Sequence, residues 1–289
     1  MGRWLMLFNT LGALALMAGC GGGGSTPSDS PYPASMNYPA ATAAMTLFNE
    51  YRAQSLVPPV GLNLKNSLAC QAHADYLNDN DISLSVVGLG AHTEDPALPG
   101  YTTDGAIAGA NSVIYEGVTA EEAIENWMST FYHRLGLLNP NLKTIGFGSA
   151  DEYQVMDIIS GIDNGANQVT SMVMFPPPGA EDVPVKFKKE IPYPIPGDES
   201  LGVPITVEFY GNLISALQVD IARLEDLGSG QVVDCYVQTP TDPFLDDWTY
   251  QYVVALLPKD PLPKGHTFRV YVTGQVNHLP WTANWDFST

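Results

Sequence analysis

A run of three prolines and one glycine, from Pro176 to Gly179, divides the chain into two parts with different apolar patterns. Proline lacks a backbone N–H and fixes φ, so neither a helix nor an internal strand continues through such a run. Before it, apolar residues recur at helical spacing; after it, they alternate or form short runs between Pro and Gly turns. We therefore expect an α+β domain over residues 39–175 and an all-β sandwich over residues 180–289.

The first part shows helix patterns followed by strand patterns. Helices are expected over residues 40–55, 66–78 and from 119 onward, where Thr119 and Glu122 form a capping-box pattern. Strands are expected over residues 144–149, 153–159 and 168–175. Between them, residues 79–111 are rich in Gly, Pro and Thr, which predicts a functional loop or one that carries short elements.

In the second part, strand patterns recur at short intervals, as in β-sandwiches. They cover residues 203–210, 214–224, 231–238, 250–257, 267–276 and 285–289. The stretch LPKGHTFRVYVTGQV, followed by NWDFST, resembles bacterial Ig-like modules. The resemblance implies an Ig-like sandwich.

The N-terminus has the pattern of an export signal. Arg3 precedes an apolar stretch over residues 4–17, which is shorter than the roughly 20 residues needed to span a bilayer. The stretch ends in Leu-Met-Ala-Gly-Cys, which resembles a lipobox. We expect a signal peptide over residues 1–20, lipidation of Cys20 and a Gly-rich flexible tether over residues 21–38. The alternative is an ordinary secretory signal with a chance Cys.

Lipidation would make a membrane the chain's partner and would hold it in the cell envelope, facing the periplasm or the exterior. In a Gram-negative host, Gly21 after the Cys favours the outer membrane. The formal charge of -19, from 12 basic and 31 acidic residues, repels phosphates, so we expect no nucleic-acid partner. Cys70 and Cys235 lie in different expected domains, as free thiols or as an interdomain disulfide.

An ordered series of motifs resembles the CAP superfamily, the cysteine-rich secretory, antigen 5 and pathogenesis-related type. In chain order these are FNEYRAQSLVPPVGLN, LACQAHADYL, AHTED, YEG, ENWMSTFYHRLGLLNP and TIGFGSA. The segment from Trp127 to Arg134 is the most specific, with Thr130 where Ser is usual. The resemblance covers residues 40–175 and implies a CAP-type α-β-α sandwich.

The resemblance also implies a cleft lined by two His and two acidic residues. His92 and His133 match the two His, and Glu116 matches the first carboxylate. Thr130 stands where the second carboxylate is expected, and Glu94, two residues after His92, is an alternative source. Such a cleft suits Zn²⁺ or another divalent metal through His92, His133 and Glu116. Without a metal it provides a general base or only a structural hydrogen-bond network.

Other polar residues fit structural roles better. We expect His73 to be a partly buried structural residue, Arg134 to pair with an acidic residue, and His266 and His278 to be solvated. Ser129 lies one helical turn before His133, but no G-x-S-x-G motif surrounds it.

Three functions remain open. The first is a tethered binding protein for a small apolar or envelope-derived ligand. The second is a hydrolase of peptide or cell-envelope substrates that uses His92, Glu116 and His133. The third is an adhesion or interaction protein with a structural cleft. The sequence has no H-E-x-x-H, C-x-x-C or phosphate-binding loop, and the missing nucleophile motif argues against the hydrolase.

Overall fold

The computed structural model describes residues 36–163, 165, 170–245 and 252–289. The expected signal peptide, Cys20 and nearly all of the expected tether lie outside these residues. Within the described part, no helix combines the length and apolar character needed to cross a membrane.

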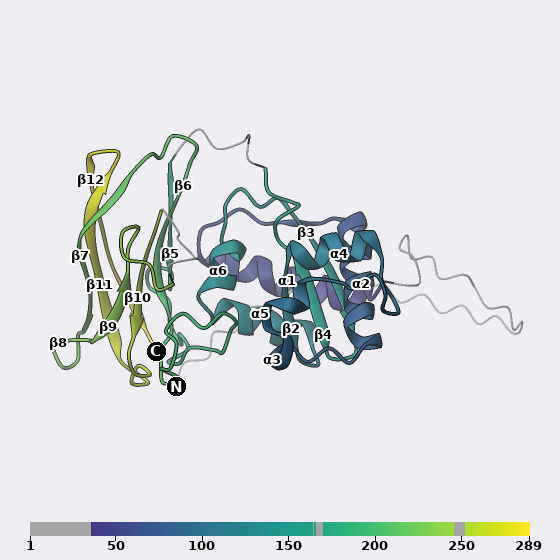
Figure 1. The fold of residues 1–289 in the computed structure, drawn as a ribbon. Coiled ribbons are helices and arrows are strands. Elements are labelled where there is room, and N and C mark those ends of the chain that lie inside the picture. The colour runs from purple at the N-terminus through teal and green to yellow at the C-terminus, as the bar shows by residue number, and fades with distance from the viewer. Residues whose placement is uncertain (1–35, 164, 166–169, 246–251) are drawn as a thin grey trace, which may run out of the picture. The chain divides into compact units, whose positions relative to one another are not determined.

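A mixed four-stranded sheet forms the centre of the first part (Figure 1). Its strands, in spatial order, are β1 (Gly61–Leu62), β3 (Thr144–Ala150), β4 (Tyr153–Asp157) and β2 (Ser112–Glu116). β1 runs parallel to β3, whereas the β3–β4 and β4–β2 pairs are antiparallel. The two strands expected at residues 144–149 and 153–159 are thus present as a hairpin.

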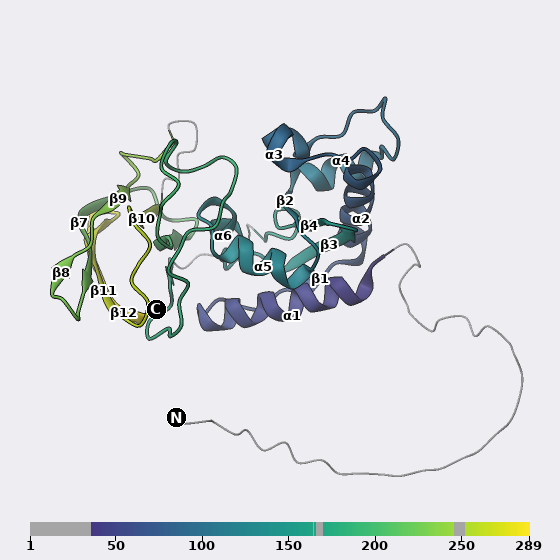
Figure 2. The ribbon, with the colours of Figure 1, turned by 90° about the horizontal axis from the view of Figure 1, so that it is seen from below.

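Helices pack on both faces of this sheet (Figures 1 and 2). They are α1 (Tyr38–Gln54), α2 (Leu64–Asp79), α3 (Leu84–Val87), the 3₁₀-helix η1 (Gly88–His92), α4 (Thr103–Ala110), α5 (Ala120–Met128) and α6 (Tyr132–Leu137). Because side chains alternate along a strand, Val113 of β2 packs with α1 and α5, and Ile114 packs with α2 and α4. The capping box expected at Thr119 and Glu122 starts α5.

Glycines let α2 lie directly against β3. A Cβ on Gly146 would come 2.6 Å from the carbonyl carbon of Asn66, and one on Gly148 would come 2.2 Å from the backbone nitrogen of Gln71. The intervening Phe147 points to the opposite face and is fully buried with α1. One strand thus carries a flat surface for α2 and an apolar surface for α1.

The second part contains two four-stranded antiparallel sheets. One has the order β5 (Ser171–Phe175), β6 (Ile205–Tyr210), β10 (Val253–Pro258), β9 (Cys235–Gln238). The other has the order β12 (Leu279–Ser288), β11 (Thr267–Val276), β7 (Leu217–Asp226), β8 (Gln231–Val232). Buried residues of both sheets, including Val207 and Val270, belong to one apolar cluster. The arrangement is compatible with a β-sandwich.

β5 corrects the expected assignment of residues 168–175 to the first domain. It pairs with β6, with Phe175 opposite Thr206, and so belongs to the second set of sheets. The fourth strand of the first sheet is β2, which lies just after the stretch expected to be a loop. Both short runs have ordinary strand composition, and only long-range pairing decides which sheet each one joins.

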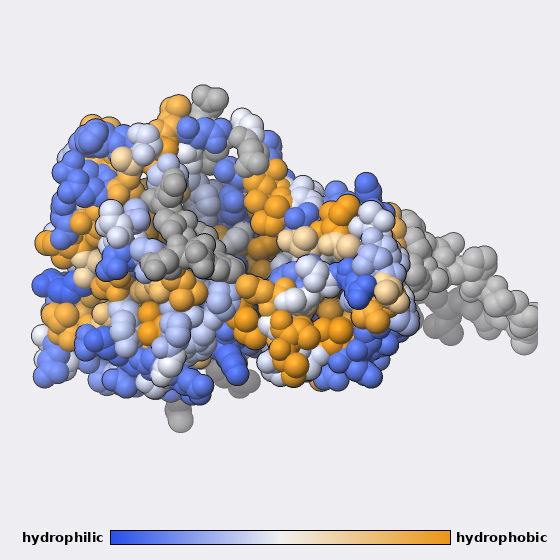
Figure 3. Space-filling model, in the orientation of Figure 1, coloured by the Kyte–Doolittle hydropathy of each residue, from blue (hydrophilic) through white to orange (hydrophobic). Residues whose placement is uncertain are grey.

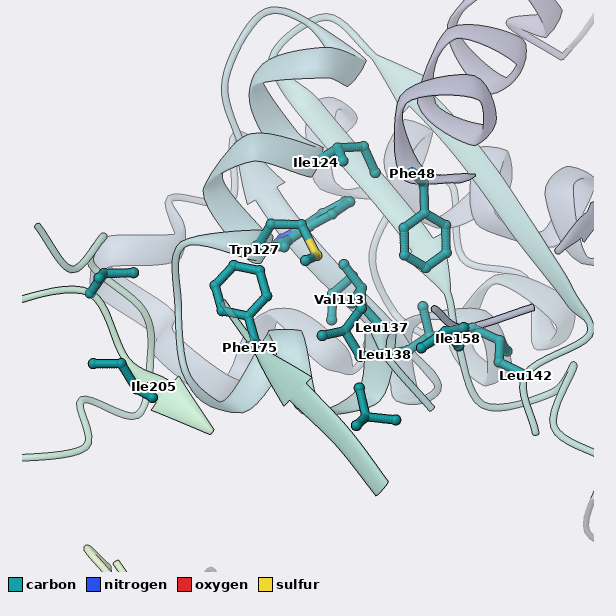
Figure 4. Packing of buried hydrophobic residues seen from close by; sticks show 14 of the residues in the cluster. Phe48, Val113, Ile124, Trp127, Leu137, Leu138, Leu142, Ile158, Phe175 and Ile205 are labelled. Carbon is teal, nitrogen blue, oxygen red and sulfur yellow. The ribbon is translucent and has the colours of Figure 1, made fainter. Parts of the chain in front are cut away.

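The buried cluster continues from the helices into β5 and β6 (Figure 4). Phe48 of α1, Trp127 of α5 and Phe175 of β5 all belong to it, as does Ile205 of β6. The indole N–H of Trp127 donates to the carbonyl of Ile114, at 3.4 Å. The core therefore does not end at the Pro176 to Gly179 run.

Candidate binding cleft

Three cavities follow one another along the described structure. We call them the central cavity, about 660 Å³ and lined by residues that include Phe209 and Tyr252; the side cavity, about 350 Å³ and lined by residues that include Glu116; and the lysine cavity, about 520 Å³ and lined by residues that include Lys186. The central and side cavities share Leu89, His92, His133 and Ile191. The side and lysine cavities share Lys189, Glu190 and Ile191. The three cavities are therefore neighbours with shared walls, and together we call them the cleft.

His92 ends η1, within the stretch expected to be a functional loop. Its Nδ1 lies 2.9 Å from the carbonyl oxygen of Gly109. A carbonyl only accepts, so Nδ1 carries the proton and Nε2 is a free acceptor among the described residues. Burial lowers the pKa of His92, the hydrogen bond to Gly109 opposes this, and the nearby His133 and His73 lower it further. His92 is therefore neutral at pH 7.

His133, the second residue of α6, is held in the same tautomer. Its Nδ1 lies 3.2 Å from Oγ1 of Thr130, whose own proton goes to the carbonyl of Trp127 at 2.7 Å. The hydroxyl must then accept from Nδ1. A carboxylate oxygen of Glu190 lies 3.1 Å from the same Nδ1, which also favours a proton there. Nε2 of His133 forms no hydrogen bond with another described residue, and His133 belongs to the cleft wall.

Glu190 is the acidic residue that the sequence did not identify. It lies between β5 and β6, 57 residues after His133. Its buried carboxylate accepts from the backbone N–H groups of Phe131 (2.8 Å), Tyr132 (3.0 and 3.2 Å) and His133 (3.3 Å). It thus caps the first turn of α6, where a negative charge also interacts favourably with the helix dipole. The sequence indicated this residue only indirectly, because Thr130 occupies the position where the resemblance places the second carboxylate.

Glu116 lines the side cavity together with both imidazoles. Its Oε2 accepts from the backbone N–H of Leu84 at 2.9 Å, which attaches the end of β2 to the start of α3. The side chain is exposed.

Glu94 does not turn toward His92. Its Oε1 lies 2.9 Å from Nδ1 of His73, and its Oε2 accepts from the N–H of Thr102 at 2.9 Å. Nε2 of His73 in turn donates to the carbonyl of Ala91, at 2.9 Å. His73 is fully rather than partly buried, so this pair is a structural link between α2, η1 and α4.

The expected metal site requires at least three ligand side chains that lie close together. Within the described part of the chain, no three His, Cys, Asp or Glu side chains gather closely enough to hold an ion. The two imidazoles are oriented as metal ligands usually are, each with Nδ1 occupied. The carboxylates of Glu94, Glu116 and Glu190, however, bind His73 or backbone N–H groups. These residues do not fit a Zn²⁺ site with three protein ligands.

The Ser129 hydroxyl donates its proton to a backbone carbonyl and not to His133. Oγ of Ser129 donates to the carbonyl of Glu125, at 2.7 Å. Arg134 does not form the expected ion pair within the described residues: it donates to the carbonyls of Met128 and Pro204 and lies 4.0 Å from the Phe175 ring centroid.

The remaining candidates do not line any of the three cavities. The His266 side chain is 41% exposed, with Nδ1 3.0 Å from Oδ2 of Asp226, and His278 is exposed as expected. Cys70 and Cys235 are free thiols and do not form the interdomain disulfide that was the alternative expectation. Burial raises the pKa of each to about 12.

Residues 45–160 match the family model of the Cysteine-rich secretory protein family, CAP. The match covers less than half of the chain, and it supports the CAP-type domain predicted from the motifs. It includes His92, Glu116 and His133 but ends before Glu190 and before the second set of sheets. No curated protein matches the chain.

Proposed function

We propose that the CAP domain is the binding part of an exported, envelope-tethered protein and that its cleft takes a small apolar molecule. The observation that carries this proposal is the central cavity. At about 660 Å³, it lies within the usual range for small-molecule sites. Its wall is mostly aliphatic and aromatic and includes Ile158, Phe209 and Tyr252, with two imidazoles at one side.

The polar groups of the wall suit recognition. The neutral His92, with Nδ1 protonated, offers Nε2 as an acceptor. His133 offers Nε2 in the same way when neutral. A hydroxyl or an N–H group on the ligand would satisfy these acceptors, and the apolar wall would bind the rest through the hydrophobic effect.

The first test measures whether a dye binds in the central cavity and whether a larger side chain in the cavity wall prevents this binding. Nile red, a neutral apolar dye, would be titrated into the full chain carrying Cys20→Ser, which removes the lipid attachment point. We expect fluorescence enhancement, and at least tenfold weaker binding after Ile159→Trp, about 1.4 kcal/mol. Ile159 is 50% exposed and lines the cavity.

Ile221→Trp is the matched control, because Ile221 is 47% exposed and lies on β7. Absence of enhancement in the parent chain, or equal enhancement in the Ile159→Trp and Ile221→Trp chains, would refute the proposal.

A second candidate function, hydrolysis, is favoured by one contact. A carboxylate beside Nδ1 of His133, with Nε2 facing the cleft, is an arrangement used by general bases. If this residue activates water, turnover of casein or peptidoglycan by the parent chain should disappear in His133→Ala and persist in His278→Ala. Equal turnover in the two variants would exclude His133 as the base.

The membrane tether is a separate part of the proposal. A Cys at the end of a short apolar signal supports lipidation, and the Gly-rich segment after it supports a flexible spacer. Cys20→Ser should move the protein from the membrane fraction to the soluble fraction. Unchanged partitioning would refute lipidation at this residue.

A further inference from the structure

Three lysines lie close together in a chain that is otherwise strongly acidic, with a formal charge of -19. Lys186, Lys188 and Lys189 are exposed and line the lysine cavity. None of the three forms an ion pair with a carboxylate among the residues that the structure describes. The nearby Glu190 directs its charge to the N–H groups of α6. Glu199 is the other carboxylate of this wall.

The backbone fixes the lysine-bearing segment at several points. The N–H of Phe187 donates to the carbonyl of Leu201 at 3.0 Å, and the N–H of Lys188 donates to the carbonyl of Ser129 at 3.2 Å. Phe187 is buried, and its ring packs edge-on against Tyr193 with 5.2 Å between centroids. The three lysines thus line a cavity that Phe187 and Tyr193 also line, on a segment whose backbone is held in place.

This cationic cavity shares wall residues with its apolar neighbours. Lys189 and Ile191 line both the lysine and side cavities, and Ile191 also lines the central cavity. Figure 3 shows an apolar area over α3 and η1, where Val86 and Leu89 are 81% and 46% exposed. Leu89 is also part of the central and side cavity walls. The neighbouring cavities of the cleft are thus lined by apolar residues, by two imidazoles and by a group of lysines.

We propose that the lysine cavity binds the anionic head of a free single-chain amphiphile, such as an alkyl phosphate or a fatty acid, whose chain lies in the central cavity. The proposal rests on the proposed function, since the chain occupies the same apolar space. An acidic protein repels such a molecule at long range, so local cations are needed to hold its head. Ammonium groups bind phosphate as point charges, and exposed ones do so in a salt-dependent way.

The test compares two ligands that differ in the head. Dodecyl phosphate, below its micelle concentration, and 1-dodecanol would each displace Nile red from the Cys20→Ser chain. We expect dodecyl phosphate to bind at least tenfold more tightly, and its advantage to decrease as salt is added. Inorganic phosphate alone should displace no dye, because it lacks the chain.

The matched variants are Lys188→Gln/Lys189→Gln and Lys65→Gln/Lys264→Gln, which change the same net charge at exposed positions. Only the first pair should remove the preference for dodecyl phosphate. If both ligands bind and both double variants keep the same preference, the lysine proposal is wrong and the apolar cavity stands. If neither ligand binds, both proposals are wrong.

The anionic headgroup could also belong to a lipid in a bilayer. Sedimentation with vesicles of phosphatidylcholine, with and without phosphatidylglycerol, distinguishes binding to a bilayer from binding to a free amphiphile. Lysine-dependent retention on phosphatidylglycerol vesicles without displacement of dye by dodecyl phosphate would overturn the assignment to a free amphiphile.

Discussion

Replacing Glu190 by Gln removes a buried negative charge while keeping nearly the same shape. In the native protein this carboxylate accepts from three backbone N–H groups and lies 3.1 Å from Nδ1 of His133. The amide keeps one acceptor oxygen and places an N–H₂ group against donors. Hydrogen bonds to a charged group contribute about 1.5–3 kcal/mol, and an unsatisfied buried donor costs about 1–3 kcal/mol. We expect Glu190→Gln to lower the free energy of unfolding by about 2–4 kcal/mol.

Urea unfolding measures this change, which corresponds to a midpoint shift of roughly 1 M for a slope of about 3 kcal/mol per M. The ¹⁵N shifts of the His133 ring, observed through long-range couplings, give a second measurement. Without the carboxylate, Nδ1 loses one of the two groups that favour its proton, so the tautomer with the proton on Nε2 should become more populated.

Glu199→Gln is the control, because Glu199 is exposed and lines the neighbouring lysine cavity. It should change the unfolding free energy by less than about 0.5 kcal/mol. If Glu190→Gln behaved like Glu199→Gln, and the His133 ring signals did not move, the carboxylate would not be holding α6 and its histidine.

Three further outcomes are expected. Burial raises the pKa of Glu208 to about 7 in the folded chain, above its ordinary value of 4.5. The stability that Glu208 contributes should therefore be fully present below pH 4.5, and the free energy of unfolding should fall by about 3 kcal/mol as the pH rises to 7. Urea unfolding at pH 5 and pH 8 should show a smaller fall for Glu208→Gln than for the parent chain. Gly109→Ala would place a Cβ 2.4 Å from Cε1 of His73, and thermal unfolding should show a loss of about 1–3 kcal/mol, whereas an unchanged melting temperature would contradict the observed packing. Calorimetry should show no tight binding of Zn²⁺. Tight binding that His92→Ala abolishes would disprove the conclusion that the cleft residues do not fit a Zn²⁺ site.

Local patterns predicted the elements whose contacts are local. Thr119 and Glu122 are three residues apart, so the start of α5 could be inferred from that segment alone. His92 and His133 were found through ordered motifs, and both line the central and side cavities.

Long-range contacts could not be predicted in the same way. Glu190 approaches α6 across 57 residues, and nothing in its own segment indicates a capping role. Glu94 satisfied the spacing rule for a partner of His92, but His73 of α2 is the imidazole that it contacts. β5 had the composition of a strand in either sheet, and its register with β6 decided its place.

The cap that Glu190 places on α6 sets a limit on how the chain can be dissected. A fragment that stops at residue 175, where the first domain was expected to end, would contain α6 and both imidazoles but would lack the carboxylate. It would also lose the carbonyl of Pro204, to which Arg134 donates at 2.9 Å. Proteolytic separation of the two parts should therefore yield an N-terminal piece with a frayed α6. The segment after the Pro176 to Gly179 run therefore supplies contacts that hold α6 and Arg134.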